Sequence, residues 1–380
     1  MADGREIIYY DLPPAPPRAA VDSRDLPLLS VSSELRYNRL LSSWVMYASH
    51  RQDRSYLPAQ EDCPLCPSRP GHPTEIPEDS YQVVVFENRF PALVHSPAGA
   101  GASAGGGTTA GGGGGAVPGP GAGAGAQGLL EGRGSAGRCE VVCYTDDHSA
   151  SFADLSPQRV DLVISALVDR TQDLLELPGV EQVYCFENRG REIGVTQPHP
   201  HGQIYAYPFV TPRTQKMLAA AEEYKRACGG NLFDDQLGAE QEAGTRVIVA
   251  TANWTAFVPH ASRWPYEVHC YPNTRVPDLA SLPGAARAEL PDVLLDIFGR
   301  FARLFDTPAP YISGWHQAPR GRGGEEMALH LEMLTFRRAN DKLKYLAGSE
   351  SGMDAFANDI LPEVAAERLR AVGTAGAPGP

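Results

Sequence analysis

Apolar residues follow two different periods along the first half of the chain. Residues 83–90 (VVVFENRF) and 183–190 (VYCFENRG) are apolar, β-branched and aromatic runs that end in a polar turn, as strands do. Residues 156–177 instead carry apolar side chains at helical intervals, with Ser156 as a candidate N-cap. The pattern therefore predicts a helix between two strands.

The second half of the chain has a similar pattern. Residues 245–272 predict two strands joined by an aromatic-rich turn, residues 287–306 an amphipathic helix, and residues 327–337 a further strand. Short links between strands favour antiparallel pairing. We expect an α+β fold made of two halves of similar plan, residues 1–212 and residues 213–380.

One segment has almost no residues that pack. Residues 98–128 consist mainly of glycine and alanine, so burial cannot offset the entropy of ordering them. Strand-like runs lie on both sides of the segment. We therefore predict a flexible insertion within the N-terminal half.

Composition and charge exclude several classes of protein. The 380 residues are 42% hydrophobic and 21% charged, which is ordinary for a globular protein with one large or two medium cores. The formal net charge of −13 disfavours a general nucleic-acid binder. The chain starts without a signal-like segment, and no apolar run reaches membrane-spanning length. We expect a cytoplasmic protein with no membrane partner.

The seven cysteines are too sparse for a disulfide framework, but two of them have a metal-ligand spacing. Cys63 and Cys66 form a C-x2-C pair, which holds zinc or acts as a redox pair. Pro64 and Pro67 favour a turn and hence zinc. Two further ligands are then needed, and the candidates are His148 and one histidine of the pair at 199 and 201.

That pair lies in the sequence QPHPHGQIYAY, residues 197–207. In an extended segment His199, His201 and Gln203 project to one side, although two ordinary surface or core histidines are the simpler interpretation. If one histidine binds zinc, the other remains available as a nucleophile towards phosphorus, and Gln203 can donate a hydrogen bond to a phosphoryl oxygen.

Two further features fit a phosphate-containing substrate. The tetrapeptide Phe-Glu-Asn-Arg occurs twice, which places Asn88 and Asn188 at equivalent strand ends. Arg51 and Arg54 follow a strand-like run and are suited to clamp phosphates, although for the pair alone a solvated turn is the better interpretation.

Together these motifs resemble a known family. FENRGREIGVTQPHPHGQIYAYPF closely resembles the active-site stretch of the galactose-1-phosphate uridylyltransferases, members of the histidine-triad superfamily. RYNRLLSSWVMYASHRQDR, CPLC, VVVFENRFPAL, VVCYTDDHS, YISGWHQAP, KYLAGSE and AAERLR match other family segments in order. The resemblance implies two histidine-triad-like halves, each a mostly antiparallel sheet with flanking helices. It also implies ping-pong transfer of UMP from UDP-glucose to galactose 1-phosphate, and a homodimer.

The resemblance assigns roles position by position. His201 becomes the nucleophile, assisted by Gln203, and one structural zinc falls to Cys63, Cys66, His148 and His199. Nucleotide and phosphate contacts fall to Arg51, Arg54, Asn88, Arg89, Asn188, Gly194, Val195, Thr196 and Gln203. The hexose-binding loop, which crosses the dimer interface in the family, falls to Lys344, Tyr345, Gly348 and Glu350.

The chain departs from some relatives in one respect that bears on metals. Those relatives hold a second metal with a glutamate and three histidines, whereas here Met217 occupies the glutamate position and only His316 and His330 remain. We therefore predict that the second metal is absent or weakly bound.

Two other readings stay open. The first is a histidine-triad nucleotide hydrolase or phosphorylase; the hydrolases carry a third histidine where this chain has Gln203. The second is a zinc-stapled binding module without catalysis, which leaves His201 and Gln203 without a role.

Overall fold

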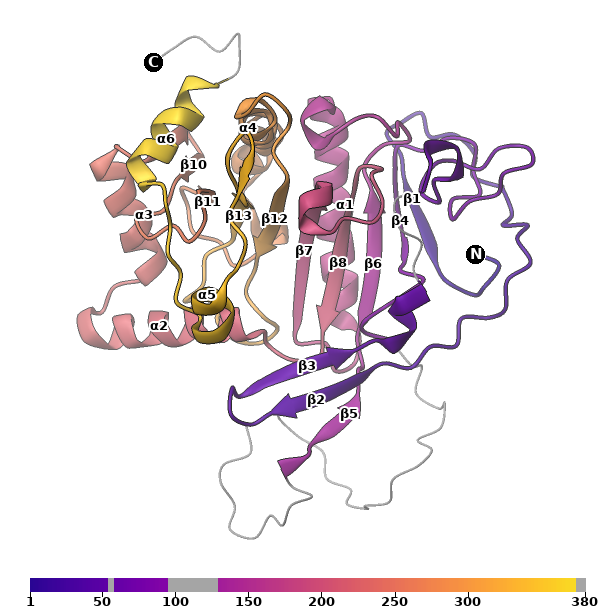
Figure 1. Cartoon of the computed structure of the whole chain (residues 1–380), viewed down its shortest axis with the longest axis horizontal. Helices are drawn as coiled ribbons and strands as arrows, with labels where there is room; N and C mark the ends of the chain where they lie inside the picture. Colours follow the sequence, from indigo (N-terminus) through magenta and orange to yellow (C-terminus); the bar gives the residue numbers. More distant parts are fainter. Residues whose placement is uncertain (54–57, 95–128, 374–380) are drawn as a thin grey trace.

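The computed structural model describes residues 1–53, 58–94 and 129–373, and its centre is a ten-stranded sheet (Figure 1). Every neighbouring pair of strands in it is antiparallel. The strands of the first half are β1 (Ile7–Tyr10), β4 (Val83–Glu87), β6 (Arg138–Cys143), β7 (Gln182–Arg189) and β8 (His201–Tyr207). Those of the second half are β9 (Val247–Ala250), β10 (Trp254–Phe257), β11 (Tyr266–Pro272), β12 (Tyr311–His316) and β13 (His330–Thr335).

The two halves repeat one strand order and join edge to edge through β7 and β12. The order across the sheet is β1-β4-β6-β8-β7-β12-β13-β11-β10-β9, so its two ends mirror each other. At the junction Phe186 pairs with Gly314. Phe186 also pairs with Gln203 on β8, and Gly314 pairs with Glu332 on β13. The register therefore makes Glu332 the counterpart of Gln203 in the second half.

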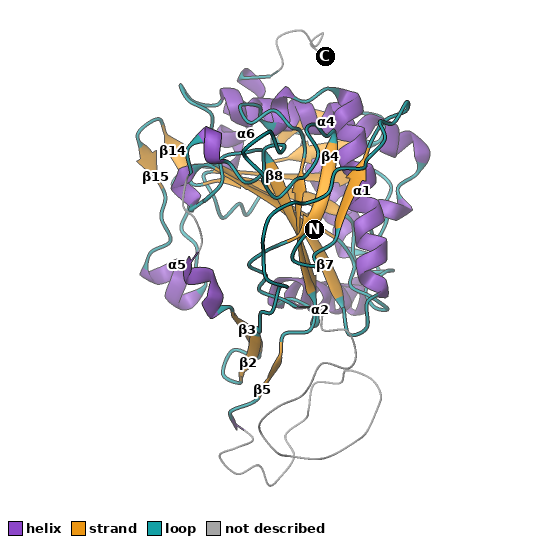
Figure 2. Cartoon of the chain, turned by 90° about the vertical axis from the view of Figure 1, so that its right-hand side faces the viewer, coloured by secondary structure: helices purple, strands orange, loops and turns teal. Residues whose placement is uncertain are grey.

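Helices cover one face of the sheet (Figure 2). α1 (Pro157–Glu176) and α4 (Gly284–Arg303) contact each other there and share a hydrophobic core with the strands. α6 (Pro362–Ala371) adds Ala365, Ala366 and Leu369 to the same core. α2 (Pro212–Cys228) and α3 (Leu232–Ala243) pack on each other in a separate cluster of the second half.

The first part of the chain adds a smaller sheet below the large one in Figure 1. It consists of β2 (Glu34–Asn38), β3 (Ser43–Tyr47) and β5 (Gly132–Gly134), and a 3-10 helix, η1 (Ser49–Asp53), follows β3. Leu35 of β2 is fully buried in a cluster with Tyr205 and Phe209. This packing holds η1 close to the uncovered face of the large sheet.

The last elements are short. β14 (Arg337–Ala339) and β15 (Lys342–Leu343) form a two-stranded sheet, and α5 (Gly348–Met353) follows them. In Figure 2, α5 lies away from the large sheet and on the side opposite its helices.

The α+β class and the antiparallel pairing predicted from the sequence are confirmed. The helix predicted over 156–177 is α1, and Ser156 caps it by accepting a hydrogen bond from the Arg159 N–H at 3.2 Å. The division near residue 212 stays a prediction, because both halves contribute to one sheet. The predicted insertion at 98–128 lies outside the described residues.

Some element boundaries were predicted incorrectly. Residues 245–272 form three strands instead of two, because the chain already reverses between β9 and β10 before it enters β11. The strand predicted over 327–337 is confined to residues 330–335. The helix predicted over 287–306 begins and ends three residues earlier, at Gly284 and Arg303. Among the described residues, no helix has the length and apolar character needed to cross a membrane.

A buried carboxylate lies beside the junction of the two halves and gives a pH-dependent prediction. Glu187 of β7 is 3% exposed, and its Oε1 accepts a hydrogen bond from the Tyr311 hydroxyl at 2.8 Å. Its Oε2 has no hydrogen-bond partner in the described part of the chain. Burial raises the pKa of Glu187 to about 7.

We expect Glu187→Gln to be more stable than the wild type at pH 8, and to lose most of this advantage at pH 4.5. Because the folded protein keeps a proton that the unfolded chain has lost, wild-type stability falls as the pH rises from about 4.5 to 7. A shift of this size corresponds to about 3 kcal/mol, and the amide avoids that cost. Urea unfolding across this pH range measures the difference. Glu176→Gln, at an exposed position of α1, is the control, and equal behaviour of the two variants would contradict the prediction.

Candidate active site and metal centre

The histidine pair lies at the start of β8, the central strand of the first half. β8 begins at His201, which pairs with Cys143 of β6. The extended segment was predicted to include His199, but the strand begins two residues later. Pro200 has no N–H to donate to a neighbouring strand. Ile204 and Ala206 pack against α1, so the alternating His201 and Gln203 face away from the helices.

His201 and Gln203 line a cavity of about 540 Å³ on this uncovered face. Most residues predicted to contact the nucleotide line the same cavity: Arg51, Asn88, Arg89, Asn188, Gly194, Val195 and Thr196. Phe86, Phe186 and Tyr205 add aromatic surface to its wall. Arg54 lies outside the described residues. Cationic and amide groups beside aromatic rings suit a ligand that has both phosphates and a base.

The ring of His201 has a defined tautomer. Its Nδ1 lies 2.7 Å from the backbone carbonyl oxygen of His199. A carbonyl only accepts hydrogen bonds, so Nδ1 carries the hydrogen, and in the neutral ring Nε2 carries the lone pair. The sequence did not indicate which group would orient this ring.

The hydrogen bonds of Arg51 and a turn at Gly190 shape two other parts of the cavity. Arg51, in η1, donates from Nε to the Phe90 carbonyl and from Nη2 to the Tyr205 hydroxyl, both at 2.9 Å. After β7 the chain turns at Gly190, where φ is +108°. A Cβ at Gly190 would lie 2.5 Å from the Cβ of Pro310, so this turn requires glycine.

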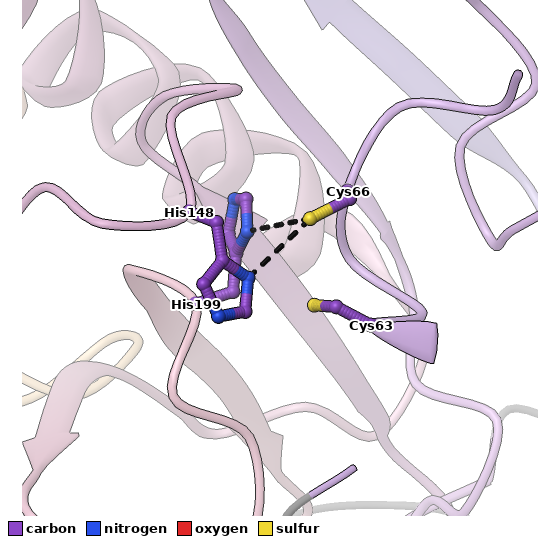
Figure 3. A group of neighbouring side chains, drawn as sticks. All are labelled: Cys63, Cys66, His148 and His199. Atoms are coloured by element: carbon purple, nitrogen blue, oxygen red, sulfur yellow. Dashed lines mark hydrogen bonds between the residues drawn. The ribbon is translucent and has the colours of Figure 1, made fainter. Parts of the chain in front are cut away.

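Cys63, Cys66, His148 and His199 converge on one another (Figure 3), and Pro64 and Leu65, between the two cysteines, line the cavity. Their ligand atoms all lie within 4.8 Å of one another. The Cys66 Sγ is 3.4 Å from Nδ1 of His148 and 3.6 Å from Nδ1 of His199. Ligands of one tetrahedral zinc ion are about 3.5 Å apart, so these separations fit a zinc ion.

Hydrogen bonds outside the four ligands prepare His199 for a metal. Its Nε2 donates to the Thr145 carbonyl at 2.8 Å, which leaves the Nδ1 lone pair directed towards Cys66. The Tyr81 hydroxyl lies 2.7 Å from the same Nε2 and donates to the Leu65 carbonyl. Burial lowers the pKa of His199 to about 4, so its ring is neutral.

The two thiols bind a metal only after they lose their protons. Burial, followed by the adjacent Cys63, raises the pKa of Cys66 to about 12. Two neighbouring thiolates are stable only beside a positive charge, which a divalent metal supplies.

Comparisons with known proteins match both halves of the chain to one family. Residues 26–211 match the model of the galactose-1-phosphate uridyl transferase N-terminal domain, and residues 217–376 match that of its C-terminal domain. The chain belongs to the galactose-1-phosphate uridylyltransferase family. A galactose-1-phosphate uridylyltransferase of Streptomyces lividans is 44% identical, over 98% of this chain and 96% of that protein. One of Thermotoga maritima is 34% identical, over 89% and 98%. A solved uridylyltransferase structure superposes with a TM-score of 0.72 at 28% identity, over 89% of this chain and 98% of that one.

The hexose-binding loop expected from the family lies elsewhere. None of Lys344, Tyr345, Gly348 and Glu350 is among the described residues that line the cavity. Lys344 and Glu350 form an ion pair at 3.0 Å, and Tyr345 is 69% exposed. Within a single chain, these residues are therefore not brought together with His201.

The structure adds a carboxylate to the histidine cluster that the sequence left as His316 and His330. Glu332 approaches Nε2 of His316 at 3.4 Å and Nε2 of His330 at 3.5 Å. Arg213 also donates to Glu332 at 2.7 Å, so a protein cation already balances this carboxylate. Met217, at the glutamate position of some family members, packs beside Leu218 and Phe233.

Sequence reasoning missed two charged residues of the cavity, Arg5 and Glu75. They are 70 residues apart in the chain and have no shared motif. The sequence around Arg5 has no pattern that distinguishes a buried arginine from a solvent-exposed one.

Proposed function

We propose that this chain exchanges UMP between UDP-glucose and galactose 1-phosphate through a covalent uridylyl-His201. This ping-pong reaction gives UDP-galactose and glucose 1-phosphate in galactose metabolism. The main support is the geometry of His201, a cavity-lining imidazole whose Nδ1 is bonded to the His199 carbonyl. Family membership supports the choice of both substrates.

The second half-reaction reverses the bond changes of the first: the P–N bond that forms in the first step breaks in the second. In the first, the Nε2 lone pair attacks the α-phosphorus of UDP-glucose, a P–N bond forms, and the P–O bond to glucose 1-phosphate breaks with its electron pair. In the second, a phosphate oxygen of galactose 1-phosphate attacks that phosphorus, and the P–N bond returns its electrons to Nε2. The hydrogen on Nδ1 stays in place throughout.

Gln203 supports the transferring phosphoryl group, and its loss should slow both half-reactions. It lies two residues after His201 on the same face of β8, where its amide can donate to a phosphoryl oxygen as charge develops. We expect Gln203→Ala to lower the rate of His201 labelling by about 10²–10³, by analogy with the loss of an oxyanion donor. Rapid-quench labelling measures this rate. Gln197→Ala, also at the cavity, is the comparison, and an equal loss there would contradict a specific role for Gln203.

Incubation with UDP-glucose alone, followed by intact-mass measurement, tests the proposed function. We expect one uridylyl group per chain and its release by galactose 1-phosphate. A nucleotide hydrolase would instead release UMP without an acceptor, a phosphorylase would require inorganic phosphate, and a binding module would gain no mass.

We further propose one structural zinc ion per chain, held by Cys63, Cys66, His148 and His199. Four protein ligands leave no open coordination position, so zinc would cross-link segments that are distant in sequence. We also propose that no second metal binds strongly at His316 and His330, because Arg213 supplies positive charge to Glu332. Metal analysis of the purified protein tests both statements.

We propose that the chain is a homodimer in which the Lys344–Glu350 loop of one subunit completes the sugar site of the other. Two observations support the proposal: the residues of this loop are not among the described residues that line the cavity of their own chain, and Tyr345 is exposed. Sedimentation equilibrium tests the oligomeric state.

A further inference from the structure

A compact network of charged side chains forms part of one wall of the cavity. Its centre is the carboxylate of Glu75, whose side chain is 9% exposed. Arg5 donates to Glu75 Oε2, Arg24 lies 2.9 Å from Oε1, and Arg89 lies 3.5 Å from Oε1. Arg5 and Glu75 also line the cavity themselves. Three arginines therefore converge on one carboxylate at the edge of the nucleotide pocket.

Two of these arginines belong to a segment that precedes the matched family domain, which begins at residue 26. Arg5 is 2% exposed, and its Nε donates to Asp3 at 2.8 Å. Arg24 is held by Asp22, whose carboxylate also accepts from the Ala2 N–H at 2.9 Å. The N-terminal segment thus places Arg5 in the wall of the cavity and Arg24 against Glu75.

The network is connected to the residues that face the nucleotide. Arg5 donates from Nη1 to the carbonyl of Glu87, the last residue of β4, and Asn88 and Arg89 follow directly. The Glu75 N–H donates to the Pro64 carbonyl at 3.0 Å, inside the C-x2-C turn. Glu75 thus links the metal-binding turn, the N-terminal segment and the end of β4.

Arg89 is the open member of the network. Its side chain is 43% exposed, whereas those of Arg5 and Arg24 are 1% and 11% exposed. An arginine side chain loses rotamer entropy when a ligand immobilises it. A carboxylate that already holds the guanidinium at the cavity reduces this cost and so increases affinity.

We propose that Glu75, fixed by Arg5 and Arg24, is a positioning residue that holds Arg89 for nucleotide binding. The N-terminal segment would thereby build part of the nucleotide pocket. The proposal rests on the proposed function, because it assumes that the cavity binds UDP-glucose. It predicts an effect on affinity and leaves the chemistry of His201 unchanged.

We expect Glu75→Gln to raise the Kd for UDP-glucose about tenfold, with full labelling of His201 at saturating UDP-glucose and unchanged zinc content. The direction is informative. Removal of a negative charge near a phosphate site would by itself tighten binding, so weaker binding indicates lost positioning. Isothermal titration with UDP-glucose measures Kd, and intact mass measures labelling.

Asp3→Asn is the matched control. It removes the other carboxylate bound to Arg5, and its side chain is 2% exposed, but Asp3 is not among the described residues that line the cavity. We expect a lower melting temperature and a Kd within twofold of the wild type. If Asp3→Asn weakens binding as much as Glu75→Gln, the effect is general destabilisation and the proposal fails.

A double-mutant cycle separates positioning from a direct contact. In an Arg89→Gln background, Glu75→Gln should change Kd by less than twofold, because the group that it positions is gone. A full tenfold effect in that background overturns the proposal. Should Glu75→Gln not fold, Arg24→Gln removes one support of Glu75 and should raise Kd about threefold; an unchanged Kd then counts against the proposal. Failure of the wild type to be labelled would instead refute the proposed function.

Discussion

The His201→Asn variant should gain no uridylyl group from UDP-glucose while it keeps its full zinc content. Asparagine has no ring nitrogen lone pair to attack phosphorus, so the covalent intermediate cannot form. The ring of His201 is not part of the described metal group, and its Nδ1 bonds to the backbone carbonyl of His199. Intact mass and metal analysis of one sample measure both quantities. Turnover should fall below detection.

The chain offers a matched control for this variant. His330 of β13 also bonds its Nδ1 to the carbonyl two residues earlier, that of Ala328, at 2.8 Å. The strand register makes it the counterpart of His201 in the second half, but His330 is 0% exposed and lies beside Glu332. His330→Asn should therefore still be labelled at His201. Labelling that persists in His201→Asn would end the assignment of the nucleophile.

The comparison of the two halves supports the proposal that the chemistry takes place in the first half. Where Gln203 offers an amide to the cavity, Glu332 holds a carboxylate, which repels phosphate oxygens. Where Cys143 pairs with His201, the ring of Tyr271 stacks on His330 at 4.6 Å and covers it. One strand plan thus gives an accessible imidazole in one half and a covered imidazole in the other.

Much of the site was predictable because its motifs are local. Alternation along a strand placed His201 and Gln203 on one face, and two prolines marked the Cys63–Cys66 pair as a turn. Local chemistry did not decide which histidine joins the cysteines. That depends on where β8 begins, and hence on the pairing of His201 with Cys143, a contact between segments 58 residues apart.

Other features depend on long-range packing and had no local pattern. The joining of β7 to β12 follows from the complete sheet, since each strand alone reads as an ordinary half-buried strand. The same holds for Arg5, which becomes part of a cavity only when β1 pairs with β4 and brings the N-terminus to Glu75. The three-strand arrangement of residues 247–272 was missed because the turn between β9 and β10 is very short.

Cys63→Ser should abolish zinc binding and lower the stability of the protein by about 4 kcal/mol. A metal that binds only the folded chain stabilises it by about this amount when its concentration is a thousand times its Kd. The four ligands come from a turn before β4, the loop after β6 and a position two residues before β8, so zinc would tie three segments together. Loss of this cross-link should lower the melting temperature by roughly 10 °C.

Cys139→Ser is the matched control for this loss. Cys139 is equally buried, at 1% exposure, but it lies outside the metal group. The Cys139→Ser variant should keep its zinc, whereas Cys63→Ser should have none. We expect Cys63→Ser to be labelled slowly by UDP-glucose. Without the metal ion the ring of His199 is held less firmly, but the carbonyl of His199 still orients His201. Metal analysis and thermal unfolding with and without a chelator decide the matter. If Cys63→Ser has the same zinc content as the wild type, the ion is held elsewhere. If labelling is lost completely in Cys63→Ser, the metal does more than support the fold.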